Sequence, residues 1–219
     1  RAQLSALQSQ INPHFLFNAL ETIRMRSLMK DEIETAKIIH NMAKIFRNSL
    51  TWGKDIVPIR DEINLITSFL EIQKYRFGDK LDYEIRVGED AEECMIPNMA
   101  LLPFIENASI HGIESLKGNG KISVSISLHS GTVTCVIKDN GAGISEGKRK
   151  QLLSSLENEE DIRENVGIKN VYYRLKLYYP DQFYFNIDSH LDSGTTITIQ
   201  LPSQIENEIH SEKYLYFIK

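Results

Sequence analysis

The sequence predicts an α+β protein, in which an all-helical region precedes a sandwich of helices and strands. Up to residue 77 the only glycine is Gly53, and proline occurs only at positions 13 and 58, which is typical of long helices. After Gly78, runs of alternating apolar and polar residues appear, which are typical of half-buried strands. We therefore divide the chain into a helical module, a sandwich domain and a short tail, with bounds 1–77, 78–203 and 204–219.

Three helices fit the first region. They are expected at about residues 1–28, 31–51 and 59–76. The segment from Trp52 to Asp55, together with Pro58, interrupts the pattern before the third helix. Gly78 follows that helix and is expected to end it.

The second region alternates strands and helices. A strand is expected at about residues 81–87, and Ser130-Gly131 is typical of a hairpin turn. Polar residues and glycines between Asn140 and Asn165 predict a mobile segment. The other expected elements are helices at about 98–111 and 166–179, and strands at about 121–128, 132–138, 183–188 and 195–201.

The composition is that of a soluble globular protein, with 42% hydrophobic and 25% charged residues in a chain of 219. The formal net charge of −5 gives no basic footprint, which argues against nucleic acid as a partner. Cys94 and Cys135 lack neighbours at metal-binding spacing, so we expect both to be reduced and buried. No apolar run reaches the length of a membrane span. Because the chain opens with Arg1 inside a helical pattern, we expect it to be a fragment of a longer protein.

His14 follows Pro13, where the apolar stripe of the first helix changes direction. Apolar side chains lie on one stripe before the proline and on another after it; they are Leu4, Leu7 and Ile11, then Leu16, Leu20 and Ile23. Proline removes a backbone hydrogen bond, so the helix is expected to bend there. An imidazole at a bend can be both exposed and oriented, as a nucleophile needs. Taken alone, His14 is more simply a partly buried structural histidine.

Two motifs contain side chains that suit a metal ion and a nucleotide base. Asn107 and His111 lie four residues apart on one helix face, and an amide oxygen can ligate Mg²⁺. Asp139 follows a strand, where its carboxylate can accept a hydrogen bond from an exocyclic amine. Gly141 and Gly143 would let the backbone approach a flat base. Each motif also has a structural interpretation without a ligand: the first can be an amphipathic helix with one polar face, and the second an ordinary turn.

A third motif opens the helix expected at residues 166–179. It reads Asn165-Val-Gly-Ile-Lys-Asn-Val171, and Gly167 precedes backbone N–H groups that can bind phosphate. A single glycine in this position is weak evidence for a phosphate site.

The segment around His14 closely resembles the phosphoacceptor box of the LytS/YesM-like sensor histidine kinases. It reads Leu7-Gln-Ser-Gln-Ile-Asn-Pro-His-Phe-Leu-Phe-Asn-Ala-Leu20. The resemblance continues through Ile59-Arg-Asp-Glu-Ile63 and Leu70-Glu-Ile-Gln-Lys-Tyr-Arg-Phe-Gly-Asp79, and it extends to Pro202. It implies that His14 is the phosphoacceptor.

The three later motifs, in their order and spacing, resemble the N, G1 and G2 boxes of the Bergerat ATP-binding fold, and Ser193-Gly-Thr-Thr-Ile-Thr-Ile199 resembles its last box. The resemblance implies that Asn107 binds Mg²⁺, that Asp139 reads adenine, and that residues 140–165 form an ATP lid. It also implies a nucleotide site that includes His111, Gly141, Gly143, Gly167 and Thr195.

The family resemblance implies a kinase that uses ATP and Mg²⁺ and passes phosphate from His14 to an aspartate of a response regulator. Two amphipathic helices per chain would bury their apolar faces as a four-helix bundle, so a homodimer is expected. The parent protein is expected to be a membrane-anchored sensor, with this region in the cytoplasm.

The sequence departs from the family pattern at three positions. The family commonly has Gln at the place of Leu102, Lys at Ile110 and Gly at Asn165, and the change at Ile110 removes an expected phosphate contact. Phe15 stands where many other histidine kinases have an acid, so the acceptor of the histidine proton is not assigned. Glu106, which adjoins Asn107, is our first candidate for this catalytic role, and Glu21 is the second.

Two other functions remain open at this point. One is a different Bergerat-fold protein, such as a serine kinase or another ATPase, although neither requires the His14 segment. The other is a degenerate kinase that forms a dimeric scaffold without turnover, which the three departures favour.

Overall fold

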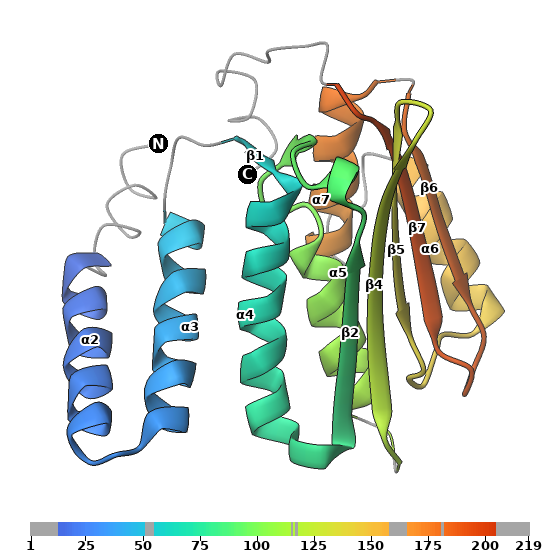
Figure 1. Cartoon of the computed structure of the whole chain (residues 1–219). Helices are drawn as coiled ribbons and strands as arrows, with labels where there is room; N and C mark the ends of the chain where they lie inside the picture. Colours follow the sequence, from blue (N-terminus) through green and yellow to red (C-terminus); the bar gives the residue numbers. More distant parts are fainter. Residues whose placement is uncertain are drawn as a thin grey trace, which may run out of the picture.

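The computed structural model describes residues 13–50, 55–114, 116, 118–157, 166–180 and 182–204. Figure 1 shows a helical hairpin beside a sheet that is covered by further helices. Among the described helices, none combines the length and the apolar character needed to cross a bilayer. The bend expected at Pro13 depends on residues outside the described part, as does nearly all of the predicted tail.

Two antiparallel helices form the hairpin. They are α2 (Pro13–Met29) and α3 (Ile33–Leu50), as the sequence predicts for the residues described. In the turn between them Asp31 adopts a left-handed backbone with φ of 59°, a conformation that Asp tolerates better than most residues. Across the hairpin, the Arg47 guanidinium lies 5.5 Å from the centroid of the Phe17 ring.

The helix α4 (Ile59–Phe77) lies between the hairpin and the sheet. As predicted, it ends at Gly78, where a φ of 59° favours glycine. Its fully buried apolar side chains belong to the same core as those of the sheet; they are Ile59, Leu65, Ile66 and Leu70. We predicted α4 as part of the helical module, but its buried side chains pack into the core of the sheet domain.

Glu62 joins α4 to the segment that begins the next helix. This carboxylate is 1% exposed and accepts hydrogen bonds from the backbone N–H groups of Met99 (2.8 Å), Leu101 (2.8 Å) and Leu102 (3.2 Å). Burial raises its pKa, and these hydrogen bonds and the positive charge of Arg174 oppose that rise. Glu62 therefore acts as a helix cap supplied from 40 residues earlier in the chain.

The contact between α3 and α4 contains several polar groups. Glu71 accepts hydrogen bonds from Lys37 Nζ and Asn41 Nδ2, each at 2.6 Å. Lys44 Nζ donates to the carbonyl oxygen of Asn64 at 3.2 Å. Partial burial alone would raise the pKa of Glu71, but the hydrogen bonds from Lys37 and Asn41 lower it below its usual value.

The five-stranded sheet has the spatial order β2 (Leu81–Val87), β4 (Gly120–His129), β5 (Thr132–Asp139), β7 (Thr195–Pro202) and β6 (Tyr184–Ser189). The β2–β4 pair is parallel, and the other pairs are antiparallel. In the predicted hairpin turn, Ser130 and Gly131 have φ of 49° and 78°, the positive values that such tight turns need. Asp139 pairs with Thr195 across neighbouring strands, so two predicted site residues adjoin.

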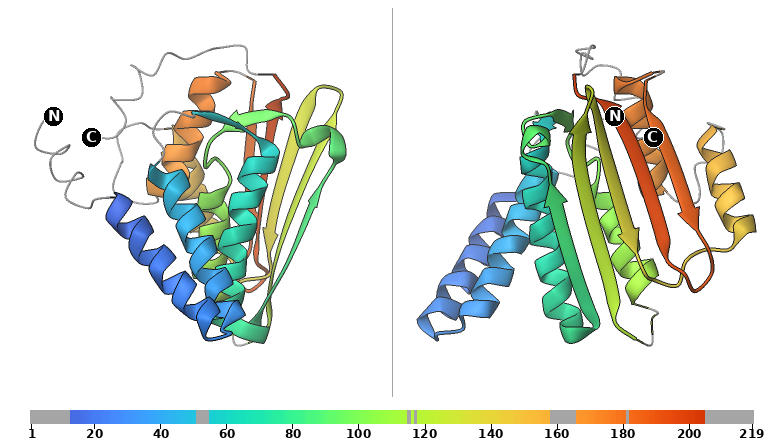
Figure 2. Two further views of the ribbon diagram at one scale, coloured as in Figure 1. Left: turned by 60° about the vertical axis from the view of Figure 1, so that its left-hand side comes forward. Right: turned by 45° about the vertical axis from the view of Figure 1, so that its right-hand side comes forward.

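Helices cover one face of the sheet, as Figure 2 shows. They are α4, α5 (Leu102–Asn107), α6 (Glu146–Glu157) and α7 (Val166–Tyr178). A mobile segment without a helix was predicted between Asn140 and Asn165, and this is wrong for α6, because the buried side chains of Leu152 and Leu156 anchor this helix in the core. A separate two-stranded sheet, β1 (Ile56–Pro58) with β3 (Met95–Pro97), was also not predicted.

The helix expected at residues 98–111 differs from the prediction at both ends. It begins at Leu102, because Met99 has a φ of 55° and Pro103 occupies the first turn, where proline is tolerated. After Asn107 it continues as a π-helix, Ala108–Ile113. Such wide turns occur often at functional sites.

Candidate functional site

A cavity of about 410 Å³ lies between the sheet and helices α5, α6 and α7. Ile137, Ile187 and Ile197, from three neighbouring strands, give it an apolar wall. Polar groups from other segments lie around this wall. A mostly apolar cavity with a few placed polar groups is the usual form of a small-molecule site.

Asp139 is the buried acid of the cavity, at the end of β5. It is 5% exposed, and its Oδ1 accepts a hydrogen bond from the N–H of Gly141 at 2.8 Å. Burial raises the pKa of the Asp139 carboxyl, while hydrogen bonds from the N–H groups of Gly141 and Thr195 oppose the rise. The carboxylate is thus held in place by the backbone on two sides.

Glycines allow α5 and its π-helical extension to approach the strand end that carries Asp139. A Cβ on Gly141 would lie 2.3 Å from Cα of Gly112, and one on Gly143 would lie 1.9 Å from the carbonyl oxygen of His190. Gly143 also has a φ of 64°, which disfavours other residues. The N–H of Ala142 donates to the Gly112 carbonyl at 3.1 Å, which fixes the two segments together.

Asn107 and His111 both line the cavity from the helical side. Asn107 ends the α-helix, and His111 lies in the π-helix that follows. They therefore reach the same cavity as Asp139, Gly143 and Thr195, although the chain separates them by up to 88 positions.

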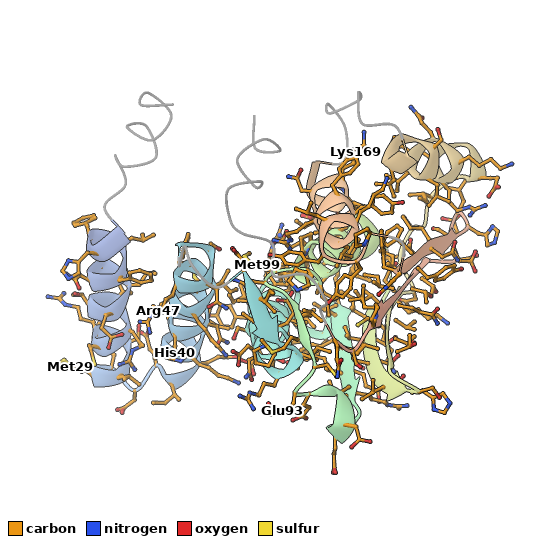
Figure 3. The ribbon with its side chains drawn as sticks, turned by 90° about the horizontal axis from the view of Figure 1, so that it is seen from above. Met29, His40, Arg47, Glu93, Met99 and Lys169 are labelled. Atoms are coloured by element: carbon orange, nitrogen blue, oxygen red, sulfur yellow. The ribbon has the colours of Figure 1, made fainter. Side chains whose placement is uncertain are left out.

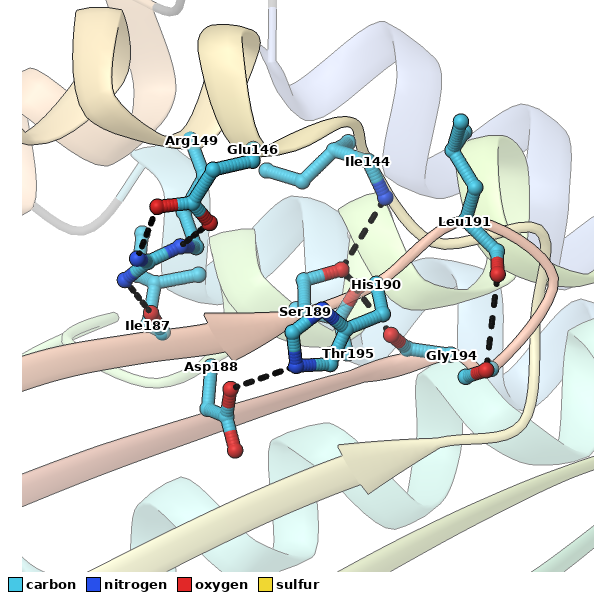
Figure 4. A network of polar contacts seen from close by, with 11 residues as sticks. Ile144, Glu146, Arg149, Ile187, Asp188, Ser189, His190, Leu191, Gly194 and Thr195 are labelled. Atoms are coloured by element: carbon cyan, nitrogen blue, oxygen red, sulfur yellow. Dashed lines mark hydrogen bonds and ion pairs between the residues drawn. The ribbon is translucent and has the colours of Figure 1, made fainter.

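Ser189 ties Thr195 to the loop after β5, as Figure 4 shows. Its hydroxyl lies 2.9 Å from Thr195 Oγ1 and accepts from the N–H of Ile144 at 3.0 Å. Nearby, Arg149 Nη1 donates to the carbonyl of Ile187 at 3.2 Å and pairs with Glu146 at 2.9 Å. Hydrogen bonds from Arg149 and Lys150 lower the pKa of Glu146 to about 2. These contacts dock α6 onto β6 beside the cavity.

Two lysines in the cavity lining were not singled out from the sequence. Lys169, on the first turns of α7, is 5% exposed, and Figure 3 shows its position. Lys148 reaches the cavity from α6. The signal for Lys169 was present, because it lies in the third motif, two residues after Gly167. Both bring amino groups to the cavity lining. Ile110, which stands where the family commonly has lysine, is 43% exposed and does not line the cavity.

Besides His14, three predicted site residues lie outside the cavity lining. Gly141 packs behind it against Gly112, and Gly167 lies at the start of α7 beside Pro103. Glu106 is half-buried, and burial raises its pKa, but the structure does not bring it to the cavity.

His14 is exposed in the first turn of α2, away from the cavity. Figure 1 shows that α3 and α4 lie between α2 and the helices of the cavity. Asn18 Nδ2 lies 3.2 Å from His14 Nδ1. Glu21, the second candidate acid, pairs instead with Arg24.

The described residues offer no ready-made metal cage. Among them, no cluster of three or more His, Cys, Asp or Glu side chains could hold a metal ion. A divalent ion here would therefore need ligands from the nucleotide and water besides the Asn107 amide, which is how Mg²⁺ is commonly held with phosphates.

Two family models match consecutive parts of the chain. The family described as histidine kinase matches residues 2–81, and that described as histidine kinase-, DNA gyrase B-, and HSP90-like ATPase matches residues 98–205. The first match covers the hairpin and α4, and the second covers the cavity.

Several known proteins are similar to this chain. Sensor histidine kinase YpdA of Escherichia coli K12 is 34% identical over 206 residues, which cover 93% of this chain and 35% of YpdA. Sensor histidine kinase YesM of Bacillus subtilis is 30% identical over 204 residues, covering 93% and 34%. The chain thus spans about a third of the length of these relatives.

The fold also matches a solved structure. The catalytic domain of histidine kinase ThkA superposes with a TM-score of 0.51 at 13% identity, covering 69% of this chain and 97% of that domain. Because a histidine kinase model covers the helices that carry His14 and an ATPase model covers the sheet and the cavity, the chain belongs to the histidine kinase family.

Proposed function

We propose that this chain is the catalytic region of a sensor histidine kinase, which binds ATP with Mg²⁺ in the cavity and phosphorylates His14. The observation that carries the proposal is the convergence of Asn107, His111, Asp139 and Thr195 on one cavity. A coincidental arrangement of an amphipathic helix and an unrelated turn would not require this convergence.

Each cavity group has a chemical task in this proposal. Asp139 accepts a hydrogen bond from the amine of adenine, and the isoleucine wall contacts the flat base. Lys148 and Lys169 offset phosphate charge. Asn107 would hold Mg²⁺ through its amide oxygen, and the bound ion lowers the charge repulsion that opposes phosphoryl transfer.

A second copy of the chain is the partner that the hairpin favours. Large apolar side chains on α2 and at the start of α3 are exposed by 48–82%; they are Phe15, Ile23, Met25, Met29 and Ile33. Pairing two hairpins would bury these side chains in a four-helix bundle. We further propose a response regulator as the phosphate acceptor and, since the relatives are longer, a membrane-anchored parent with this region in the cytoplasm.

Incubation with γ-labelled ATP and Mg²⁺ tests the activity. A phosphohistidine is stable in alkali and labile in acid, whereas a phosphoserine shows the reverse. Acid-labile label on the chain supports the kinase. Acid-stable label would favour a serine kinase, and a protein that binds ATP without taking label would be a scaffold.

Replacing Asp139 by asparagine is expected to weaken ATP binding by roughly 1–3 kcal/mol, the usual cost of losing a charge-assisted hydrogen bond. GTP should compete poorly with the unaltered protein, because its 6-oxo group accepts where adenine donates. Calorimetric titration measures both. Asp82→Asn, an exposed change on β2, is the control. An unchanged affinity in Asp139→Asn would remove this residue from the site.

Replacing Asn107 by alanine should abolish Mg²⁺-dependent phosphorylation, because the amide ligand is lost while the fold survives. Asn170→Ala, at an exposed position of α7, is the matched control. Labelling at increasing Mg²⁺ concentrations, with circular dichroism of both variants, separates the outcomes. If the Asn107 variant alone unfolds, Asn107 has a structural role in its helix instead.

A further inference from the structure

A buried serine, Ser189, lies behind the cavity-lining residue Thr195. Ser189 is 2% exposed at the end of β6, and Thr195 is its direct pairing partner at the start of β7. Three polar atoms surround the Ser189 hydroxyl oxygen: the Gly194 carbonyl oxygen at 2.9 Å, Thr195 Oγ1 at 2.9 Å and the Ile144 backbone nitrogen at 3.0 Å. Figure 4 shows these three contacts.

The number of protons available to these atoms fixes the direction of each hydrogen bond. The Ile144 N–H can only donate and the Gly194 carbonyl can only accept, so the single hydroxyl proton of Ser189 points to the Gly194 oxygen. The bond between the two hydroxyls must then run from Thr195 to Ser189. The opposite direction would place the Ser189 and Gly194 oxygens 2.9 Å apart with no proton between them, which is unfavourable for buried acceptors.

Thr195 therefore presents only an acceptor to the cavity. A hydroxyl has one proton and two lone pairs, and the proton of Thr195 is used on Ser189. Thr195 lines the cavity, so it offers a lone pair to a bound molecule. Asp139, its pairing partner across β5 and β7, offers carboxylate lone pairs to the same cavity. Two neighbouring acceptors suit an atom that carries two protons, such as the 6-amino nitrogen of adenine.

We propose that Ser189 is a positioning residue for base recognition: it fixes the Thr195 hydroxyl as an acceptor, so that the cavity selects a purine with a 6-amino group over one with a 6-oxo group. This inference rests on the proposed function, in which ATP occupies the cavity. The carboxylate of Asp139 disfavours a 6-oxo group, but a hydroxyl that was free to turn could still donate to it. Ser189 does not line the cavity, so its effect on the base runs through Thr195.

Inosine triphosphate is the probe for this selection, because it differs from ATP only in its 6-oxo group and the N1 proton that accompanies it. Displacement of a fluorescent ATP derivative by ATP or by inosine triphosphate gives both affinities, and their ratio is the readout. A substitution that only loosens the fold weakens the binding of both nucleotides together. A substitution that frees or removes the Thr195 hydroxyl changes the ratio.

Ser189→Ala should narrow the preference for ATP over inosine triphosphate by about threefold to tenfold, the range of a neutral hydrogen bond, because Thr195 regains a donor. Ser189→Cys, whose thiol is a weak donor and acceptor, should shift the ratio in the same direction. Thr195→Val removes the hydroxyl at similar size and should also narrow the preference, whereas Thr195→Ser keeps the hydroxyl and should keep it. Ser127→Ala, exposed on β4, is the control and should leave both affinities unchanged.

The double variant Ser189→Ala/Thr195→Val separates an effect through Thr195 from a general effect of losing Ser189. If Ser189 acts through the Thr195 hydroxyl, the ratio in the double variant should stay within about twofold of that in Thr195→Val. Thermal unfolding shows which variants are folded, and Ser189→Cys takes the place of Ser189→Ala in the comparison if the alanine variant is not.

Three results would overturn the inference alone, in a chain that binds ATP. They are equal affinities of the unaltered chain for the two nucleotides, an unchanged ratio in the folded Ser189 variants, and a further narrowing in the double variant. An unaltered chain that binds neither nucleotide would overturn the proposed function together with this inference.

Discussion

Replacing His14 by glutamine is expected to reduce phosphorylation below detection while ATP affinity stays unchanged. A glutamine amide is not a nucleophile toward phosphorus, so the reaction loses the atom that forms the new bond. The binding site should not be affected, because His14 is exposed on α2 and does not line the cavity. Labelling with γ-labelled ATP measures the first quantity, and a fluorescent-nucleotide titration measures the second.

His40→Gln is the matched control for this change. His40 is also exposed on the hairpin, in α3, and is not part of the cavity lining. This variant should take label at the rate of the unaltered chain. If label persists in His14→Gln and disappears in His40→Gln, the acceptor has been assigned to the wrong helix.

Replacing Gly141 by alanine should disrupt both the cavity and the fold. The added Cβ would lie 2.3 Å from Gly112 Cα and 2.4 Å from its carbonyl carbon and oxygen, and backbone atoms cannot turn aside as a side chain can. Relief requires the two segments to separate, which breaks the hydrogen bonds from Gly141 to Asp139 and from Ala142 to Gly112. We expect a loss of about 3 kcal/mol in the free energy of unfolding, at the upper end for overpacking.

ATP affinity in Gly141→Ala should also fall by more than about tenfold, since Asp139, the proposed adenine-binding acid, moves with the strand end. Denaturant unfolding and calorimetry measure the two effects. Gly147→Ala is the control: it lies in α6, where an added Cβ meets no atom within 4 Å, and alanine is the better helix former. Equal stability of Gly141→Ala and the unaltered chain would show that helix and strand can separate without cost.

The sequence predicted those parts of the fold that depend on local pattern. The strands on either side of Ser130-Gly131 alternate cleanly, and the turn needs positive φ at both positions, so the hairpin appears where expected. Gly78 ends α4 for the same kind of reason. The convergence of Asn107 with Asp139 could be anticipated only through the family resemblance, because nothing local links a helix with a strand 32 residues later.

Features that depend on long-range contacts could not be predicted from the sequence. The strands β1 and β3 have three residues each, too few for alternation to be recognised. Glu62 reads as an ordinary acid in the first turn of a helix, although its partners begin at Met99. The helix α6 is rich in polar residues, and only the burial of Leu152 and Leu156 against the core identifies the side that packs.

Glu62 and Glu71, the acids by which α4 contacts α5 and α3, make the first of these contacts stiffer than the second. Toward α5, Glu62 is 1% exposed and accepts three backbone hydrogen bonds, so separating these helices would break all three. Toward α3, Glu71 and Lys37 are partly open to water, and an exposed pair contributes little to holding the helices together. The described core takes its fully buried side chains from Ile59 onward, while the hairpin adds only the partly buried Ile45. A force that bends the molecule would therefore change the angle between α3 and α4 first, and α4 would move together with the sheet domain as one rigid unit.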